Sequence, residues 1–117
     1  MRPIEFRAWE KKFKYMTAHI NMEHLRGGFQ GLYGNNAIVM QFTGLFDKNG
    51  VKIFEGDILR YTGSYKGHGL YQIIWTDNLQ FECLEINGNN YMMPTVWVEE
   101  MEIIGNIYEN KELLRET

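Results

Sequence analysis

Residues 37–61 read AIVMQFTGLFDKNGVKIFEGDILRY, and they carry the clearest signals of secondary structure in the chain. A β-rich run over residues 37–42 is followed by Asn49-Gly50, the pair that two-residue hairpin turns favour. A type I′ turn needs a positive φ at both central residues, which Asn and Gly adopt at low cost. Apolar residues resume after it, and residues 55–57 predict a second turn before a strand over residues 58–61. The stretch therefore predicts a series of antiparallel strands.

The flanking segments continue this pattern. On the N-terminal side, residues 4–9 alternate apolar and polar side chains as a half-buried strand does, and residues 13–16 predict the return strand of a hairpin. Residues 19–36 lose the alternation and hold four glycines, which predicts a long flexible loop. On the C-terminal side the predicted strands cover residues 70–75, 81–86, 96–98 and 103–108. Asn110 is expected to cap a terminal helical turn.

The spacing of these turns, about 8 to 12 residues, is typical of an all-β barrel or sandwich. No internal repeat, low-complexity tract or linker divides the chain. Its 117 residues, of which 44% are hydrophobic and 15% aromatic, suffice for one core and exclude intrinsic disorder. We therefore expect a single mainly β domain over residues 1–117.

The composition also bears on location. No run reaches the roughly 18 apolar residues of a membrane helix, and residues 1–5 lack the apolar stretch of a signal peptide. Cys83 is the single cysteine, so it can form no intramolecular disulfide and cannot alone supply a structural zinc site. These features predict a cytoplasmic protein without a membrane partner.

The net charge of −3 is unevenly distributed along the chain. Residues 1–26 carry six basic and three acidic groups, whereas residues 77–117 carry two basic and nine acidic groups. This asymmetry suggests head-to-tail self-association, or a basic face for an acidic partner. The alternative is that the charges interleave and cancel within one domain.

Three segments together resemble one known family. They are Met40-Gln41-Phe42-Thr43-Gly44-Leu45 with Asp47-Lys48-Asn49-Gly50 and Ile53-Phe54-Glu55-Gly56-Asp57-Ile58, then Phe6-Arg7-Ala8-Trp9, and finally residues 103–110 with Leu113-Leu114. In these segments the chain resembles the YopX family of phage and prophage proteins. Phe46 and Lys111 depart from the family's pattern, which more often has a charged residue and a proline there.

The resemblance implies a mainly β fold with a small Src-homology-3-like barrel or roll, an N-terminal hairpin, long loops and at most a short C-terminal helical turn. It also implies a phage or prophage origin, and it brings no catalytic motif. The signature has a structural explanation as well, because its glycines can form turns, Asp57 can hydrogen-bond its own turn, and its aromatic residues can fill a core.

The histidines and the cysteine are further candidates for a catalytic or metal site. His19 and His24 are five residues apart rather than the four that a helical metal site needs, and Glu23 lies between them. His68 has no carboxylate neighbour in sequence to orient it as a base. Cys83 follows Glu82, which disfavours a reactive thiolate. We therefore predict no enzyme activity, no metal and no cofactor.

Two binding functions remain open. The first is a non-enzymatic phage or prophage accessory protein that assembles with itself, with a phage protein or with a host protein. The second is a nucleic-acid-binding module, since small barrels use aromatic faces with basic rims. Its site residues would be Arg7, Trp9, Lys11, Lys12, Lys14 and Tyr15 on the N-terminal hairpin. A sequence pI near 5.6 argues against strong binding of phosphates.

Overall fold

The computed structural model describes residues 4–21, 37–61, 69–76, 80–86, 91–92 and 98–115, without the side chains of residues 18, 19, 21, 91 and 92. These residues are mainly β structure. The strands are β1 (Glu5–Glu10), β2 (Tyr15–Asn21), β3 (Ala37–Phe46), β4 (Lys52–Phe54), β5 (Asp57–Tyr61), β6 (Leu70–Trp75), β7 (Phe81–Glu85), β8 (Tyr91–Met92) and β9 (Met101–Asn106). Two short 3₁₀ helices are η1 (Val98–Glu100) and η2 (Lys111–Arg115).

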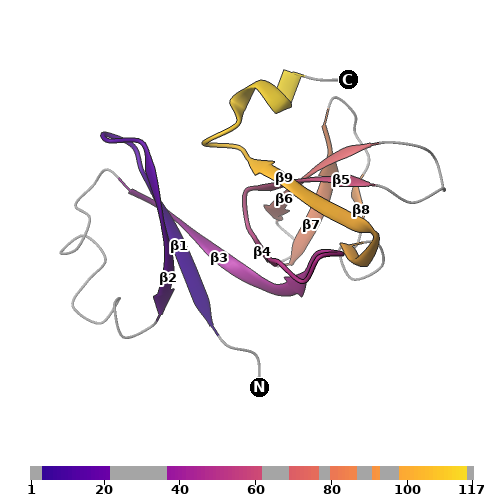
Figure 1. Cartoon of the computed structure of the whole chain (residues 1–117), viewed down its shortest axis with the longest axis horizontal. Coiled ribbons are helices and arrows are strands. Elements are labelled where there is room, and N and C mark those ends of the chain that lie inside the picture. The colour runs from indigo at the N-terminus through magenta and orange to yellow at the C-terminus, as the bar shows by residue number, and fades with distance from the viewer. Residues whose placement is uncertain are drawn as a thin grey trace.

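The strands form two antiparallel sheets. One has the order β2-β1-β3-β4 and the other the order β8-β7-β6-β5-β9. The five-stranded sheet curls into a half-barrel, and the β1–β2 hairpin stands beside it (Figure 1). The prediction of a mainly β fold with a small Src-homology-3-like barrel or roll and an N-terminal hairpin is confirmed.

Strand β3 connects the hairpin to the half-barrel. Its first half pairs with β1, from Glu10↔Ala37 to Phe6↔Gln41, and its second half pairs with β4. The strand extends beyond the β-rich run at residues 37–42 and continues to Phe46 through an irregularity at Gly44, whose φ is 87°. The hydroxyl of Thr43 donates to the carbonyl of Ile53 at 2.7 Å and closes this irregularity.

The hairpin turn between β3 and β4 lies where Asn49-Gly50 predicted it, but the type is different. Gly50 has a φ of 78°, whereas Lys14 is the one non-glycine residue with positive φ in the described part of the chain. Gly50 N donates to the carbonyl of Asp47 at 3.0 Å. The turn is therefore a three-residue loop with glycine in the left-handed region, and not type I′.

The main core lies inside the curled sheet. Ile53, Leu59, Ile73 and Met101 are fully buried there, with Cys83 among them. Between the sheets, Met40 of β3 contacts the backbone at Gly56, where an added Cβ would lie 3.1 Å from its sulfur. This contact fixes the hairpin sheet against the half-barrel.

Other boundaries also depart from the sequence-based predictions. Residues 19–21, predicted as loop, continue β2, and the rest of that loop lies outside the described residues. Val98, predicted as strand, begins η1, and β9 ends at Asn106 rather than at Tyr108. The side chain of Asn110 accepts a hydrogen bond from Asn106 N at 3.1 Å instead of capping the helical turn that follows.

Cys83 is expected to be inert toward thiol reagents in the folded protein. Burial raises the pKa of its thiol to about 12, from an ordinary value of 9.0. The thiolate fraction at pH 8 then falls about a thousandfold, and the sulfur has no access to solvent. Reaction with Ellman's reagent at pH 8 should follow unfolding, with rapid labelling only in denaturant. Rapid stoichiometric labelling of the native protein would contradict the placement of Cys83 in the core.

Candidate functional site

The turn between β1 and β2, residues 11–14, forms a projecting hairpin tip. The carboxylate of Glu10 accepts a hydrogen bond from Phe13 N, and the carbonyl of Glu10 accepts one from Lys14 N at 2.8 Å. This hydrogen-bonded turn leaves the Phe13 ring 69% exposed, with the ammonium of Lys12 5.3 Å from its centre. The tip therefore presents an aromatic ring and three lysines to solvent.

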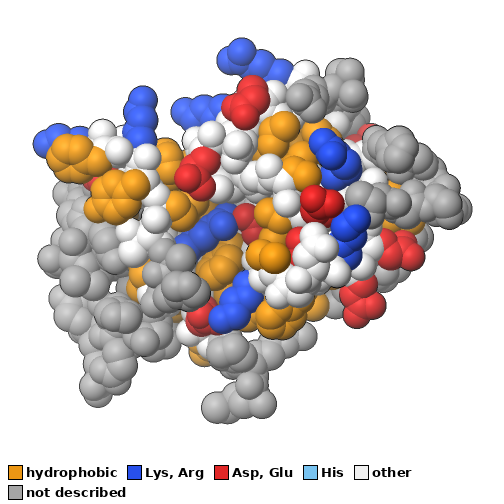
Figure 2. Space-filling model, in the orientation of Figure 1, with side chains coloured by type: hydrophobic (Ala, Val, Ile, Leu, Met, Phe, Trp, Pro, Cys, Tyr) orange, Lys and Arg blue, Asp and Glu red, His pale blue; other side chains and the backbone are white. Residues whose placement is uncertain are grey.

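A cleft of about 760 Å³ adjoins the hairpin tip. We call it the Trp9–Tyr108 cleft, because these two rings stack with centroids 5.9 Å apart at an angle of 20°. Its lining residues are Trp9, Lys11, Lys14, Ile38, Ile107, Tyr108, Glu109, Lys111 and Glu112. Basic side chains gather over the hairpin and the C-terminal end of the chain along the upper edge of Figure 2. The cleft thus combines an aromatic floor with three lysines and two glutamates on its rim.

The C-terminal wall of this cleft is held by the side chain of Asn106. Its oxygen accepts hydrogen bonds from Tyr108 N at 3.0 Å and from Glu109 N at 2.8 Å. Its nitrogen donates to the carboxylate of Glu109 at 2.8 Å. A Cβ at Gly105 would lie 2.5 Å from the side-chain oxygen of Asn110, so glycine is required for this close approach. The wall is a rigid turn rather than a continuation of β9.

Behind the cleft, Arg7 and Asp57 form a buried ion pair between the two sheets. Arg7 Nη2 lies 2.8 Å from Asp57 Oδ1, and the side chains are 10% and 3% exposed. Arg7 also donates to the carbonyl of Glu55 at 3.1 Å, and its guanidinium lies 4.9 Å from the centre of the Phe54 ring. Asp57 Oδ2 accepts a hydrogen bond from Phe54 N at 2.7 Å, which confirms that Asp57 bonds its own turn.

Burial raises the pKa of Asp57 to about 6 from 3.8, and the attraction of Arg7 offsets this only in part. Between these two pH values the folded protein holds a proton that the unfolded chain releases. The contribution of Asp57 to stability is therefore complete below pH 3.8 and is lost as pH rises through 6. We expect this group to lower the free energy of unfolding by about 3 kcal/mol between pH 4 and pH 7. Urea denaturation across this range tests it, and the double variant Arg7→Met/Asp57→Asn, which lacks the titrating carboxyl, should not show this component.

Five of the six residues predicted for nucleic-acid binding lie at the hairpin tip, next to it or in the cleft beside it, and the sixth, Arg7, is buried. Trp9, Lys11 and Lys14 line the Trp9–Tyr108 cleft, and Lys12 lies on the adjoining tip. Tyr15, 47% exposed, begins the return strand. The placement of Arg7 on this surface is wrong, because its guanidinium is buried against Asp57.

The other sequence candidates contribute no site among the described residues. His24, His68 and Glu23 lie outside those residues, as does the side chain of His19. In the described ranges no group of three His, Cys, Asp or Glu side chains could hold a metal ion, including around Glu99, Glu100 and Glu102.

Sequence reasoning missed the C-terminal half of the cleft. Tyr108 and Lys111 are about one hundred residues from Trp9 and Lys11 in the chain. The pairing of β9 with β5 and the contact between the two sheets bring them together. Burial raises the pKa of the Tyr108 hydroxyl, with a further contribution from Glu55. The one feature of the sequence that could have indicated Tyr108 as a site residue is its aromatic side chain within the C-terminal signature.

The fold and the cleft define a small β protein with an aromatic cleft beside its N-terminal hairpin. Comparison with models of known protein families identifies one family for this chain. The model of the YopX protein family matches residues 5–115. The chain belongs to this family.

A solved structure has a similar fold. The crystal structure of protein EF1440 from Enterococcus faecalis is similar over 98% of this chain and 100% of that chain, with a TM-score of 0.68 and 26% sequence identity. No curated protein matches the chain. Within the described residues, no helix has the length and apolar character needed to cross a membrane.

Proposed function

We propose that this protein is a phage or prophage accessory protein of the host cytoplasm that acts as a non-enzymatic binding or assembly module. The hairpin tip is the observation that carries the proposal. Phe13 and Tyr15 are exposed together at the end of a hydrogen-bonded turn that carries three lysines. Aromatic side chains that remain in water beside a charged rim are typical of a surface that another macromolecule covers.

The roles of the signature residues support the same proposal. Arg7, Asp57 and Asn106 are polar residues of the signature, and each makes buried contacts that hold sheets or turns together. These contacts give the three side chains structural roles in the described part of the chain. We therefore assign the proposed function to the exposed surface.

The test is the mass of the purified protein together with the capture of partners. Size-exclusion chromatography with light scattering should show self-association, or an immobilised chain should retain a defined phage or host protein from prophage-bearing cells. Phe13→Ser, which changes an exposed ring only, should reduce either interaction. A monomer that retains no partner would contradict the proposal, as would catalytic turnover in the purified protein.

Nucleic-acid binding is the second candidate, and the Trp9–Tyr108 cleft favours it. Lys11, Lys14 and Lys111 surround the cleft, and in the described part of the chain none of them forms an ion pair. Binding of short DNA or RNA should then weaken steeply with salt, and the slope should fall when these three lysines become alanine. Absence of binding to single- and double-stranded probes at low salt would exclude it.

A further inference from the structure

We propose that copies of this chain join head to tail, with the hairpin tip of one copy entering a groove beside η1 of the next. The inference rests on the proposed assembly function and names the two surfaces that would carry it. Both surfaces belong to the described residues, and they lie on different parts of the molecule. The proposed occupant of the groove is a second copy of this chain, because the charges of the two surfaces match and one chain cannot bring them together.

The hairpin tip is a small projecting surface that is basic and partly apolar. Lys11, Lys12 and Lys14 surround the exposed ring of Phe13, and no acidic side chain of the described residues is paired with any of the three. The carboxylate of Glu10 is turned inward and accepts the hydrogen bond of Phe13 N. Within the part of the chain that the structure describes, the three ammonium groups therefore have no ion-pair partner, and the Phe13 ring is largely exposed.

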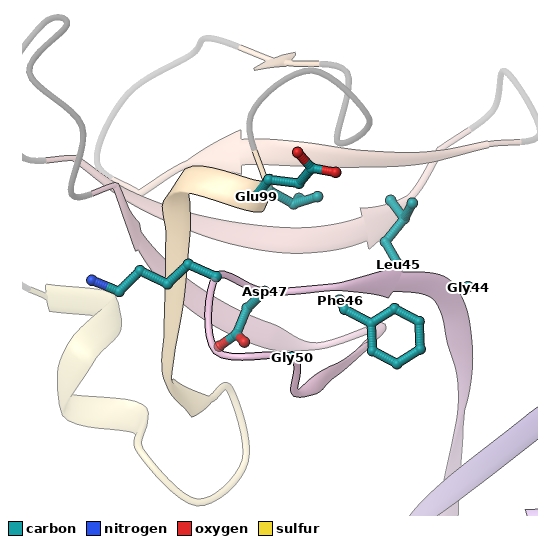
Figure 3. Close-up of a pocket in the computed structure, with 8 residues that line it drawn as sticks. Gly44, Leu45, Phe46, Asp47, Gly50 and Glu99 are labelled. Carbon is teal, nitrogen blue, oxygen red and sulfur yellow. The ribbon is translucent and has the colours of Figure 1, made fainter.

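The groove supplies the complementary surface. It is a hollow of about 510 Å³ between the β3–β4 hairpin and η1, lined by Gly44, Leu45, Phe46, Asp47, Lys48, Gly50, Val98 and Glu99. The positive charge of Lys48 is offset by Glu102, whose carboxylate lies 3.5 Å from its ammonium. Figure 3 shows Glu99 on one side of this hollow, with Leu45 and Phe46 across from it. Phe46 is 46% exposed, and Glu100 adds a second carboxylate to η1. An aromatic ring with ammonium neighbours matches such an acidic, apolar groove.

One chain cannot fill its own groove with its own tip. Glu10 pairs with Ala37 at the start of β3, next to the tip, whereas Phe46 at the end of β3 lines the groove. The ten residues of β3 span about 30 Å at roughly 3.3 Å per residue. Because β3 is paired on both halves, it holds the two surfaces apart. Contact between them requires two molecules.

The backbone at the tip is consistent with a role beyond folding. Lys14 has a φ of 55°, a conformation that glycine or asparagine adopts at lower cost. A lysine at this position keeps a positive charge beside Phe13 at the expense of a less favourable turn. Lys14→Gly is therefore a useful variant, because it should preserve or improve folding while weakening association up to about fivefold.

The geometry of this contact fixes the kind of assembly. Tip and groove are different surfaces, so the contact is heterologous and builds a closed ring or an open filament. The tip is small compared with the roughly 800 Å² per partner of a standard interface, so a single contact is weak. Association should therefore depend on concentration in the micromolar range and weaken as salt screens the charges.

Charge reversal tests the contact directly. Sedimentation velocity of nucleic-acid-free protein would compare the native chain with a tip variant, Lys11→Glu/Lys12→Glu/Lys14→Glu, and a groove variant, Glu99→Lys/Glu100→Lys. Each variant alone should associate at least about tenfold more weakly than the native chain. An equimolar mixture should recover association, because the acidic tip of the first meets the basic groove of the second, and the basic tip of the second meets the acidic groove of the first.

Controls separate this contact from general effects of charge and folding. Arg115→Glu changes an exposed basic residue of η2 that lines neither the groove nor the cleft beside the tip, and it should associate like the native chain. Glu100 also accepts a hydrogen bond from the hydroxyl of Tyr61, so Glu99→Lys alone serves if the double groove variant unfolds. Thermal melting establishes folding for each variant.

The outcomes distinguish the two proposals. An oligomer whose mass is unchanged in both reversal variants would overturn the head-to-tail contact and leave the assembly function in place. Loss of association in both variants without recovery on mixing would also overturn the pairing of tip with groove. A native chain that stays monomeric at all concentrations and retains no partner would overturn both proposals.

Discussion

Arg7→Met is expected to lower the free energy of unfolding by about 3 kcal/mol at pH 8, the usual cost of removing one partner from a buried ion pair. The substitution leaves the carboxyl group of Asp57 buried without its countercharge. It also removes the donor to the carbonyl of Glu55 and the cation over the Phe54 ring. Denaturation in urea measures the loss, which is a large share of the 5 to 15 kcal/mol or so that stabilises a small domain.

The loss should depend on pH in a defined direction. Arg7 lowers the pKa of Asp57, so its removal raises that pKa above its native value of about 6. A carboxyl group with a raised pKa in the folded state loses its contribution to stability as pH rises through that pKa. The variant should therefore continue to lose stability between pH 6 and pH 8, where the contribution of Asp57 in the native chain is constant. At pH 5 the difference should be less than half of that at pH 8.

A second substitution separates the buried charge from the packing. Arg7→Met/Asp57→Asn removes both charges and keeps an amide oxygen that can accept the hydrogen bond of Phe54 N. It should be more stable than Arg7→Met at pH 8. Lys52→Met at the partly exposed pair with Glu5 is the matched control and should cost less than about 1 kcal/mol. Equal losses from Arg7→Met and Lys52→Met at every pH would contradict the role of the buried pair.

The burial of Arg7 shows that alternation along a strand can predict the strand without predicting which side chains are exposed. Alternation in β1 located the strand correctly, and alternation normally assigns one face to solvent. In the structure β1 is the central strand between β2 and β3, and Arg7, Ala8 and Trp9 are all buried. A strand covered on both faces does not separate its polar and apolar sides. The partner of Arg7 is fifty residues away, so no local pattern could reveal the ion pair.

Turn positions were predictable for a local reason, whereas the cleft was not. Glycine with its neighbours marks the chain reversals at residues 49–50 and 55–57, since few other residues adopt those conformations. Trp9 and Lys11 can be predicted to lie on one surface for a similar reason, because they are two residues apart on one hairpin. Tyr108 completes the cleft only through the pairing of β5 with β9. That pairing depends on long-range register, which a single sequence does not encode in its spacing.

The β3–β4 turn illustrates how a distant contact selects a conformation. Lys48 N donates to the carbonyl of Met101 at 2.9 Å, and Ile103 N donates to Asp47 Oδ2 at 3.0 Å. These bonds fasten the turn to β9, more than fifty residues along the chain. Asn49-Gly50 by itself permits a type I′ turn, but the buried carboxylate of Asp47 favours the three-residue loop that serves both its own turn and β9.

Asp47→Ala is accordingly expected to lower the free energy of unfolding by about 3 kcal/mol, near 1 kcal/mol for each hydrogen bond lost. Asp47 Oδ1 accepts from Asn49 N at 2.8 Å and from Val51 N at 2.9 Å, while Oδ2 accepts from Ile103 N. Alanine leaves all three amides without this acceptor, and it also frees the turn from β9. Thermal and urea denaturation measure the loss of stability, and amide hydrogen exchange at Ile103 reports the opening of this contact.

Two further variants test whether the carboxylate of Asp47 causes this loss of stability. Asp47→Asn keeps one oxygen for the turn but directs an amide nitrogen toward Ile103 N or toward the turn, so it should lose about half as much stability as alanine. Asn49→Ala changes an exposed side chain in the same turn and should cost less than about 0.5 kcal/mol. If alanine at residues 47 and 49 cost the same, the turn would be held by glycine and backbone bonds alone. A larger loss at Asp47 would instead show that its carboxylate joins the central signature to the C-terminal strand.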